Sequence, residues 1–481
     1  MNILQACQHP EIFGPWFRKP ETYERWFAFL AALFALPMDE RQAELYRQHT
    51  GRTELPTEAT QEAWLITGRR GGKSFVMALV AVFLACFFDY RQHLAPGERA
   101  TVMVIAADRR QSRVIIRYIR AMLTRIPMLE AMVERDTSES FDLNNLVTIE
   151  VGTASFRSTR GYTYAAVLCD EIAFWRTDDA AEPDYAILDA IRPGMATIPN
   201  AALICASSPY ARRGALWDAF RRYFGKDGKP LVWKATTKEM NPTIRQEVID
   251  EAMERDPASA GAEYLAEFRA DIEAFINREA VEACTSPGVF ERAPLSSQRY
   301  FAFVDPSGGS ADSMTLAIAH LEGKVAILDA VRERKPPFSP EAVVTEFADL
   351  LKQYRINKVT GDRYAGEWPR EGFRNRQITY EPSAAPKSDL YRDLLPLLNS
   401  GEVDLLDHPH LINQLVGLER RTSRAGKDSI DHAPGGHDDV ANAVAGVLTT
   451  VRTRKSSYQL SWEALGTKPN DARPFWPILS R

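Results

Sequence analysis

A short apolar strand, a glycine-rich turn and a long apolar helix, in that order, constrain this chain more than any other feature. Residues 63–67 are typical of a strand, and residues 75–88 form an uninterrupted apolar run. The turn between them reads Gly68-Arg69-Arg70-Gly71-Gly72-Lys73-Ser74. Such a turn at a helix N-terminus aims backbone N–H groups at one point, where they bind phosphate oxygens. The order therefore predicts a phosphate-binding loop.

The loop departs from the usual spelling of this motif, G-x-x-x-x-G-K-[ST]. The residue five positions before Gly72 is Thr67, and Gly68 comes one residue late. The flanking strand and helix still favour a phosphate loop over a turn that merely starts a helix. In such a loop, Lys73 would reach the β- and γ-phosphates of ATP, and Ser74 would ligate Mg²⁺.

An acidic pair follows a second apolar segment, residues 164–169. In an ATP site, Asp170 would hold the magnesium ion through its water shell, and Glu171 would orient or deprotonate the attacking water. An acidic pair after a strand is weak evidence alone, because many strands end in polar residues. Downstream of a phosphate loop, it predicts ATP hydrolysis.

The wider pattern predicts an α/β protein with two large domains. Strands alternate with helices over 61–275, which indicates a parallel sheet with ligands at the carboxyl ends of its strands. We predict a P-loop ATPase domain of the ASCE type there, with a helical N-terminal segment, 1–60, packed on it. Pro and Gly residues suggest a linker over 276–298, and 456–481 reads as a polar tail.

A second set of carboxylates lies in the segment 299–455, which we predict to be an RNase H-like nuclease domain. Asp305 ends one strand, Asp362 follows another, and Asp438 and Asp439 open the last helix. Carboxylates that converge from separate elements can hold two Mg²⁺ or Mn²⁺ ions, which clamp the attacking and leaving oxygens of a phosphodiester. Each aspartate alone is also common at strand ends and helix caps.

Two points in this predicted metal site stay open. Either Asp438 or Asp439 can be the metal ligand, with the other acting as the helix N-cap. His437 can position a metal-bound water or simply cap its loop.

Composition narrows the class of protein. With 481 residues, 45% apolar and 26% charged, the chain is typical of a soluble globular protein with more than one domain. The net charge of −5 means that a DNA-binding surface must be local, as in the arginine cluster from Arg109 to Arg120; the alternative for that cluster is a solvated helix face. Five scattered cysteines without a C-x-x-C pair, no secretory signal and no membrane-spanning run favour the cytoplasm.

Over roughly residues 60–450, the chain resembles the large terminase subunits of tailed bacteriophages, which package DNA into capsids. The likeness is carried by the deviant loop with Arg69, by Ser158-Thr159-Arg160-Gly161, by Asp170-Glu171, and by Asp305-Pro306-Ser307 with His437-Asp438-Asp439. It implies that Arg160, eleven residues before Glu171, acts on a neighbouring subunit's ATP; the alternative is a surface arginine.

The resemblance assigns further residues. Ser207 and Ser208 would couple the γ-phosphate to elements that grip DNA, or would simply end a strand. A glutamine upstream of the loop would contact adenine, and Gln42 and Gln48 are both candidates.

The function that the resemblance implies is an ATP-driven motor that moves double-stranded DNA into a procapsid and cuts concatemers with its nuclease. Its partners would be DNA, a small terminase subunit and the portal protein. It would work as a homo-oligomeric ring in the host cytoplasm, transiently docked on the procapsid. The alternative is a helicase-like or repair translocase whose C-terminal domain binds DNA without cleaving it.

Overall fold

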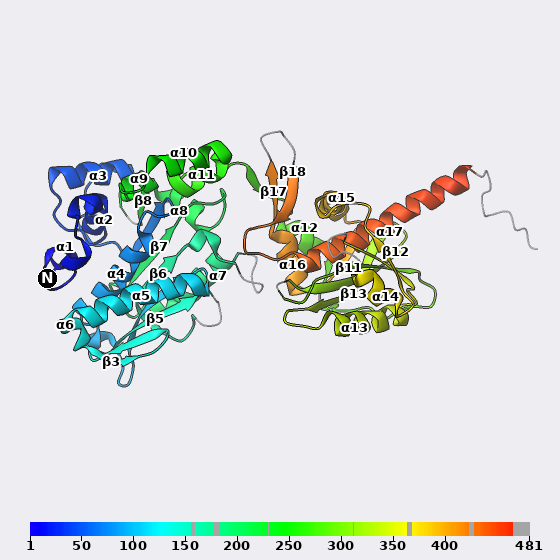
Figure 1. The fold of residues 1–481 in the computed structure, drawn as a ribbon, viewed down its shortest axis with the longest axis horizontal. Helices are drawn as coiled ribbons and strands as arrows, with labels where there is room; N and C mark the ends of the chain where they lie inside the picture. Colours follow the sequence, from blue (N-terminus) through cyan, green and yellow to red (C-terminus); the bar gives the residue numbers. More distant parts are fainter. Residues whose placement is uncertain are drawn as a thin grey trace, which may run out of the picture. The chain divides into compact units, whose positions relative to one another are not determined.

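The chain divides into two compact α/β units, Met1–Glu273 and Ala274–Arg481 (Figure 1). The computed structural model describes residues 1–154, 159–176, 182–228, 230–310, 312–362, 368–422 and 428–464, with the side chains of Trp368 and of 453–464 left out. Among the described residues, no helix combines the length and the apolar character needed to cross a membrane.

The first unit is built on an eight-stranded sheet in the order β3-β4-β5-β2-β6-β7-β1-β8. Its strands are β1 Glu62–Thr67, β2 Ala100–Ala106, β3 Val133–Asp136, β4 Ser140–Leu143, β5 Val147–Thr153, β6 Thr163–Asp170, β7 Ala202–Ser207 and β8 Leu231–Ala235. The strands from β5 to β8 in this order are all parallel. Because β7 lies between β1 and β6, the sheet has the arrangement expected of an ASCE-type fold.

Helices cover both faces of this sheet. Those of the first unit are α1 Ile3–Gln8, α2 Glu24–Leu33, α3 Glu40–Thr50, α4 Lys73–Phe87, α5 Arg109–Arg125, α6 Pro127–Glu130, α7 Pro183–Met195, α8 Ala215–Tyr223, α9 Thr237–Met240, α10 Gln246–Arg255 and α11 Pro257–Leu265. The apolar α4 is buried with α5 on one face, and α7 and α8 pack on the other. The N-terminal helices share the α4 core through Trp26 and Phe29, which explains their aromatic content.

The second unit is built on a seven-stranded mixed sheet in the order β10-β16-β13-β12-β11-β14-β15. The short β9, Ile272–Ala274, lies at the boundary; the later strands are β10 Thr285–Ser286, β11 Tyr300–Asp305, β12 Met314–Glu322, β13 Val325–Arg334, β14 Lys358–Gly361, β15 Thr379–Pro382, β16 Val403–Leu406, β17 Leu418–Thr422 and β18 Asp428–His432. β12 is antiparallel to both neighbours, whereas β14 and β15 run parallel to β11. The order of β11 to β15 is that of the expected RNase H-like sheet, and the α/β class is confirmed.

Helices also cover both faces of the second sheet. They are α12 Arg278–Ala283, α13 Pro340–Gln353, α14 Trp368–Arg374, α15 Lys387–Asn399, α16 Pro409–Val416 and α17 Asp439–Ala464. α15 and α17 share a core with the residues of one sheet face, and α13 shares a core with the other.

Two sequence expectations need correction. The expected linker, 276–298, contains α12 and β10, and β10 pairs with β16. Ile276, Val281 and Cys284 are buried in the second unit's core, so these apolar residues, which precede Pro287 and Gly288, decide the structure. The last helix also runs beyond the expected start of the tail at 456, as far as Ala464; residues 465–481 lie outside the described residues.

α17 packs so closely on β11 that a glycine in the helix is required. A Cβ atom added at Gly446 would lie 2.3 Å from Cδ2 of the buried Phe303. Gly→Ala inside a helix usually stabilises by about 1 kcal/mol. Here we expect Gly446→Ala to destabilise the second unit by about 1–3 kcal/mol through overpacking.

Thermal and urea unfolding measure this effect. The double variant Gly446→Ala/Phe303→Leu is the matched test, because the smaller leucine makes room for the added methyl group. In the Phe303→Leu background, Gly446→Ala should lower the free energy of unfolding by less than it does in the wild type. A higher melting temperature for Gly446→Ala would contradict the packing argument.

Candidate functional site

The glycine-rich loop joins the carboxyl end of β1 to the first residue of α4. Its backbone takes positive φ at Arg70 (66°) and at Gly72 (101°). A Cβ atom at Gly68 would lie 2.3 Å from Thr237 Oγ1, so this position also requires glycine. Trp26 Nε1 donates to the Gly71 carbonyl at 2.9 Å and thereby ties the N-terminal segment to the loop.

Lys73 is buried at the start of α4 and points back along the loop. Its Nζ donates to the Thr67 carbonyl at 2.9 Å and to Ser208 Oγ at 3.0 Å, and it lies 3.4 Å from Glu171 Oε1. The side chain is only 4% exposed. A buried ammonium at a helix N-terminus attracts an anion strongly, because both the charge and the orphan N–H groups face it.

Asp170 and Ser74 lie side by side, as the predicted magnesium site requires. Ser74 Oγ donates to Asp170 Oδ2 at 3.1 Å. Burial and the neighbouring Glu171 raise the pKa of Asp170, although Gln111, Lys73 and Ser74 act in the opposite direction. Asp170 Oδ1 is buried without a hydrogen-bond partner among the described residues. An orphaned carboxylate oxygen in this position fits a site for a hydrated cation.

Glu171 connects the acidic strand end to the serine pair after β7. Its φ is +53°. Its Oε2 accepts hydrogen bonds from Ser207 Oγ and from the Ser208 N–H, both at 3.1 Å. The structure therefore brings Lys73, Glu171, Ser207 and Ser208 together at the carboxyl ends of β1, β6 and β7.

Two of the predicted arginines are exposed at the surface. Arg69 is exposed, and its guanidinium pairs with Glu263 at 3.0 Å. Arg160 is exposed next to Gly161, and Ser158 of the same motif lies outside the described residues.

The two glutamine candidates for adenine contact make different bonds. Gln42 closes the capping box of α3 with Asp39. Gln48 Nε2 donates to Glu239 Oε1 at 3.0 Å, in the helix α9 that also contacts the loop through Thr237.

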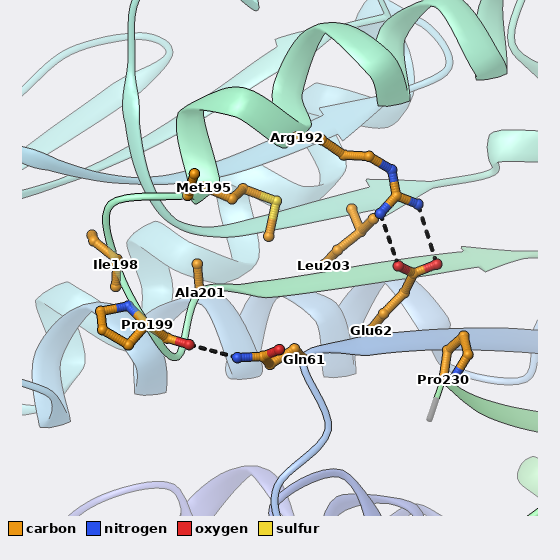
Figure 2. Close-up of a pocket in the computed structure, with 10 residues that line it drawn as sticks. Gln61, Glu62, Arg192, Met195, Ile198, Pro199, Ala201, Leu203 and Pro230 are labelled. Atoms are coloured by element: carbon orange, nitrogen blue, oxygen red, sulfur yellow. Dashed lines mark hydrogen bonds and ion pairs between the residues drawn. The ribbon is translucent and has the colours of Figure 1, made fainter. Parts of the chain in front are cut away.

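A separate cavity of about 490 Å³ opens at the amino ends of β1 and β7, opposite the ends that carry the Lys73 cluster (Figure 2). Glu62, the first residue of β1, pairs there with Arg192 at 3.0 Å. The phosphate loop follows the other end of β1, so this cavity is not part of the Lys73 cluster.

In the second unit, Asp305 and Asp362 converge on one amide. Asn442 Nδ2 donates to Asp305 Oδ2 at 2.8 Å and to Asp362 Oδ2 at 3.3 Å. Burial raises the pKa of Asp305 well above its usual value; the Asn442 bond opposes this, and Asp439, Asp362 and Asp438 add to it. Carboxylates crowded in this way gain stability when a cation binds between them.

Asp439 faces this pair from the first residue of α17. Its Oδ2 accepts from the Ser313 N–H at 3.1 Å. Burial raises the pKa of Asp439 to about 6; the Ser313 bond opposes the rise and Asp438 adds to it. Among the described residues Asp439 forms no ion pair, whereas the adjacent Asp438 pairs with Lys387.

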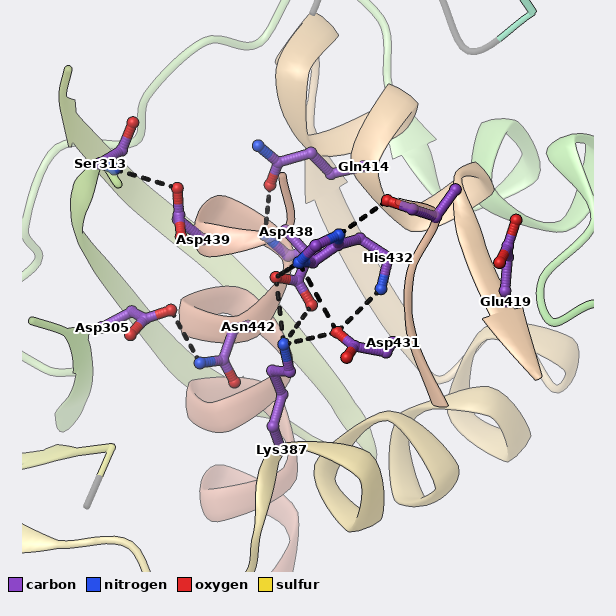
Figure 3. Close-up of polar contacts among 12 residues, drawn as sticks. Asp305, Ser313, Lys387, Gln414, Glu419, Asp431, His432, Asp438, Asp439 and Asn442 are labelled. Atoms are coloured by element: carbon purple, nitrogen blue, oxygen red, sulfur yellow. Dashed lines mark hydrogen bonds and ion pairs between the residues drawn. The ribbon is translucent and has the colours of Figure 1, made fainter. Parts of the chain in front are cut away.

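Asp438 faces a different set of partners (Figure 3). It is 4% exposed, and its Oδ2 accepts from Tyr391 Oη at 2.8 Å and lies 3.0 Å from Lys387 Nζ. Lys387 Nζ also lies 2.7 Å from Asp431 Oδ1. Asp431, His432 and Asp438 offer ligand atoms within 4.8 Å of one another, but this ammonium already neutralises two of the three.

Asp438 stands at the N-cap position of α17, where its backbone carbonyl accepts from the Asn442 N–H at 2.7 Å, but in the described part of the chain its side chain makes no bond to the first N–H groups of the helix. Gln414 Oε1 accepts from the N–H groups of Val440 and Ala441 at 2.9 and 3.0 Å. His437, the third residue of the sequence motif, is exposed.

Sequence reasoning missed three polar residues that organise these sites, namely Gln111, Asn442 and Lys387. Asn442 lies three residues after Asp439, so helical spacing places it on the same face and could have identified it. Gln111 lies in the first turn after a parallel strand, which is the usual position for ligand contacts. No sequence signal identifies Lys387.

No protein-family model and no curated protein matches the chain. Among solved structures, the large terminase of bacteriophage HK97 matches 82% of this chain and 91% of its own length at 18% identity, with a TM-score of 0.36. The large terminase of a thermophilic bacteriophage matches 89% and 98% at 12% identity, with a TM-score of 0.37. The large terminase nuclease of thermophilic phage G20c matches 35% and 94% at 15% identity, with a TM-score of 0.31. The chain is thus similar in structure to bacteriophage large terminases over 82–89% of its length.

Proposed function

We propose that this protein is an ATP-driven DNA translocase and metal-dependent endonuclease that packages viral DNA. The observation that supports it is the presence of two separate constellations in one chain. Lys73, Glu171 and the Asp170–Ser74 pair lie in the first unit. Asp305 and Asp362 share the Asn442 amide in the second.

In the ATPase half, the backbone N–H groups of the loop and Lys73 would hold the β- and γ-phosphates. Ser74 and Asp170 would hold the magnesium ion, which fits the unpartnered Asp170 Oδ1. Glu171 would orient and deprotonate the attacking water. Its bonds to Ser207 and Ser208 would carry the change at the γ-phosphate to the end of β7.

In the nuclease half, Asp305, Asp362 and Asp439 would ligate Mg²⁺ or Mn²⁺, and two ions fit the proposed chemistry. Divalent ions bound there would neutralise the scissile phosphate and generate the attacking hydroxide. Asp438 would position Asp439 rather than ligate, because Lys387 and Tyr391 already satisfy it.

The resemblance in sequence motifs extends the proposal to partners. These are double-stranded DNA, a small terminase subunit that selects the cutting site, and the portal protein of the procapsid. The chain would act as a homo-oligomeric ring in the host cytoplasm, transiently docked on the procapsid. Grip on DNA would be directed at the backbone and would weaken with salt.

Removal of divalent metal tests both halves together. We expect the purified chain to hydrolyse ATP with Mg²⁺ and to cut plasmid DNA with Mg²⁺ or Mn²⁺, and EDTA to stop both reactions, because both sites are built from carboxylates. ATP hydrolysis without any cleavage in either metal would favour the alternative, a helicase-like or repair translocase that binds but does not cut DNA. Cleavage without ATP hydrolysis would exclude a motor.

Arg160 is testable as a residue that acts on a neighbouring subunit. An added cation at the γ-phosphate is worth roughly 10³–10⁵ in rate. Arg160→Ala and Glu171→Gln should each lack ATPase activity, and a mixture of the two chains should regain part of it, because mixed neighbours contain one intact site. The control is Arg160→Ala alone, at the total protein concentration of the mixture. A mixture that stays inactive at concentrations where the chains associate would contradict the role.

A further inference from the structure

The helix α5 carries an arginine stripe, which we define as Arg109, Arg110, Arg113 and Arg117. All four side chains are exposed, on the side of the helix away from its buried Ile115, Ile119 and Leu123. The helix itself, Arg109–Arg125, contains no acidic residue. In a chain of net charge −5, this is a concentrated positive surface.

The charges of the stripe are not neutralised within the described residues, where no carboxylate forms an ion pair with any of the four. The Nε atoms of Arg113 and Arg117 donate to carbonyls one turn earlier in the same helix, at 3.3 and 3.1 Å. Arg120, one turn further on, differs because it pairs with Asp136 at 2.8 Å. Asp108, the residue directly before the helix, is acidic, and its Oδ1 accepts the N–H groups of Arg110 and Gln111 as the N-cap.

The same helix touches the candidate ATP site through Gln111. Its Nε2 donates to Ser74 Oγ and to Asp170 Oδ2, both at 2.8 Å. Both oxygens belong to residues proposed to hold magnesium, and the Asp170 oxygen left without a partner among the described residues is Oδ1. A cation on Ser74 Oγ and the Gln111 amide compete for the lone pairs of that oxygen, so magnesium and Gln111 cannot both use it fully.

We infer that the arginine stripe of α5 is a contact surface for the phosphate backbone of DNA, and that Gln111 couples the position of α5 to the binding of magnesium and nucleotide. The inference rests on the proposed function and extends it to a named surface and a route of coupling. Arginine suits this partner because its planar group binds phosphate oxygens in pairs. Steps of four residues give a charge about every 6 Å along the helix, which exposes several cations to one DNA backbone.

Two variants test the surface. Arg113→Ala/Arg117→Ala removes two charges from the stripe, and Arg221→Ala/Arg222→Ala removes two from α8, where both pair with Asp218. Binding to a blunt DNA duplex is measured by fluorescence anisotropy at several salt concentrations, in the full chain carrying Asp305→Asn and Asp362→Asn to prevent cleavage. The stripe variant should bind about tenfold more weakly, with a slope of log K against log salt smaller by about 1–2. The α8 variant should match the parent.

Gln111→Ala tests the coupling. In the parent, DNA affinity should differ between samples with and without a slowly hydrolysed ATP analogue and magnesium. In Gln111→Ala, the two affinities should converge, while Gln246→Ala, an exposed glutamine of α10, should behave as the parent.

The outcomes separate this inference from the proposed function. Equal affinity and salt slope for the stripe and α8 variants would overturn the surface, and an unchanged nucleotide effect in Gln111→Ala would overturn the coupling. Either result can occur with ATP hydrolysis and DNA cleavage intact, in which case the proposed function stands. If the stripe variant lost more affinity for an RNA duplex than for a DNA duplex, the assignment of the surface to DNA would also be overturned.

Discussion

Lys73→Ala will abolish ATP turnover while DNA cleavage continues. The change removes the buried ammonium that lies 3.4 Å from Glu171 and 3.0 Å from Ser208 Oγ. Loss of one preorganised charge that stabilises a transition state costs roughly 10²–10³ in rate or more. Phosphate release measures turnover, and plasmid cleavage with Mn²⁺ measures the other activity. The exposed Lys226→Ala is the matched control and should behave as the wild type.

Lys73 is buried, so its removal can also disturb folding. Glu171→Gln separates the two effects because it keeps the size of the side chain and an oxygen that can accept from Ser207 and the Ser208 N–H. We expect this variant to bind ATP, melt near the wild-type temperature and fail to hydrolyse. Substantial ATPase activity in Lys73→Ala would refute the phosphate loop, and activity in Glu171→Gln would refute its role toward water.

Asp439→Asn will mainly reduce DNA cleavage, whereas Asp438→Asn will mainly lower the melting temperature, although the two residues are adjacent. Asp439 forms no ion pair among the described residues, and burial, with the nearby carboxylates Asp438 and Asp312 adding to it, raises its pKa to about 6. Neutralising it should reduce cleavage roughly 10²-fold or more and leave the melting temperature unchanged or higher, because repulsion is relieved.

Asp438→Asn should mainly lower stability. It removes the charge that Lys387 and Tyr391 share on Asp438 and leaves Lys387 with Asp431 alone, and the loss of a hydrogen bond to a charged group costs about 1.5–3 kcal/mol. Residual cleavage by the folded fraction should exceed that of Asp439→Asn, since loss of a residue that only positions a ligand costs about 10–100-fold. The reverse ranking of the two variants in cleavage and melting temperature would assign the metal to Asp438.

Local sequence was sufficient to predict the elements that carry the candidate sites. The strand before Gly68 and the helix after Lys73 were predicted from apolar runs, because burial on both sides of a parallel sheet requires them. The same holds for the strands that end at Asp170 and Asp305, since the carboxyl end of a buried strand is where polar residues begin.

Local sequence could not predict partners that come from distant elements. The Pro and Gly residues of 276–298 favour a linker, but the burial of Val281 and Cys284 decides its structure, and that burial depends on contacts with β16 and α15. The end of α17 was also missed, since polar residues after Val451 give no clear stop.

The sequence by itself determined which residues could carry this chemistry: a phosphate loop at Lys73, an acidic pair at Asp170, and aspartates at three later positions. Residue type and position at a strand end are local properties, so a single sequence is enough to predict them. Only the tertiary structure decided how they are used. It turned Asp439 toward Asp305 and Asp438 toward Lys387, and it placed the Gln111 amide on Ser74 and Asp170. The direction of a side chain and its partners depend on the packing of elements far apart in sequence, and no local pattern encodes that packing.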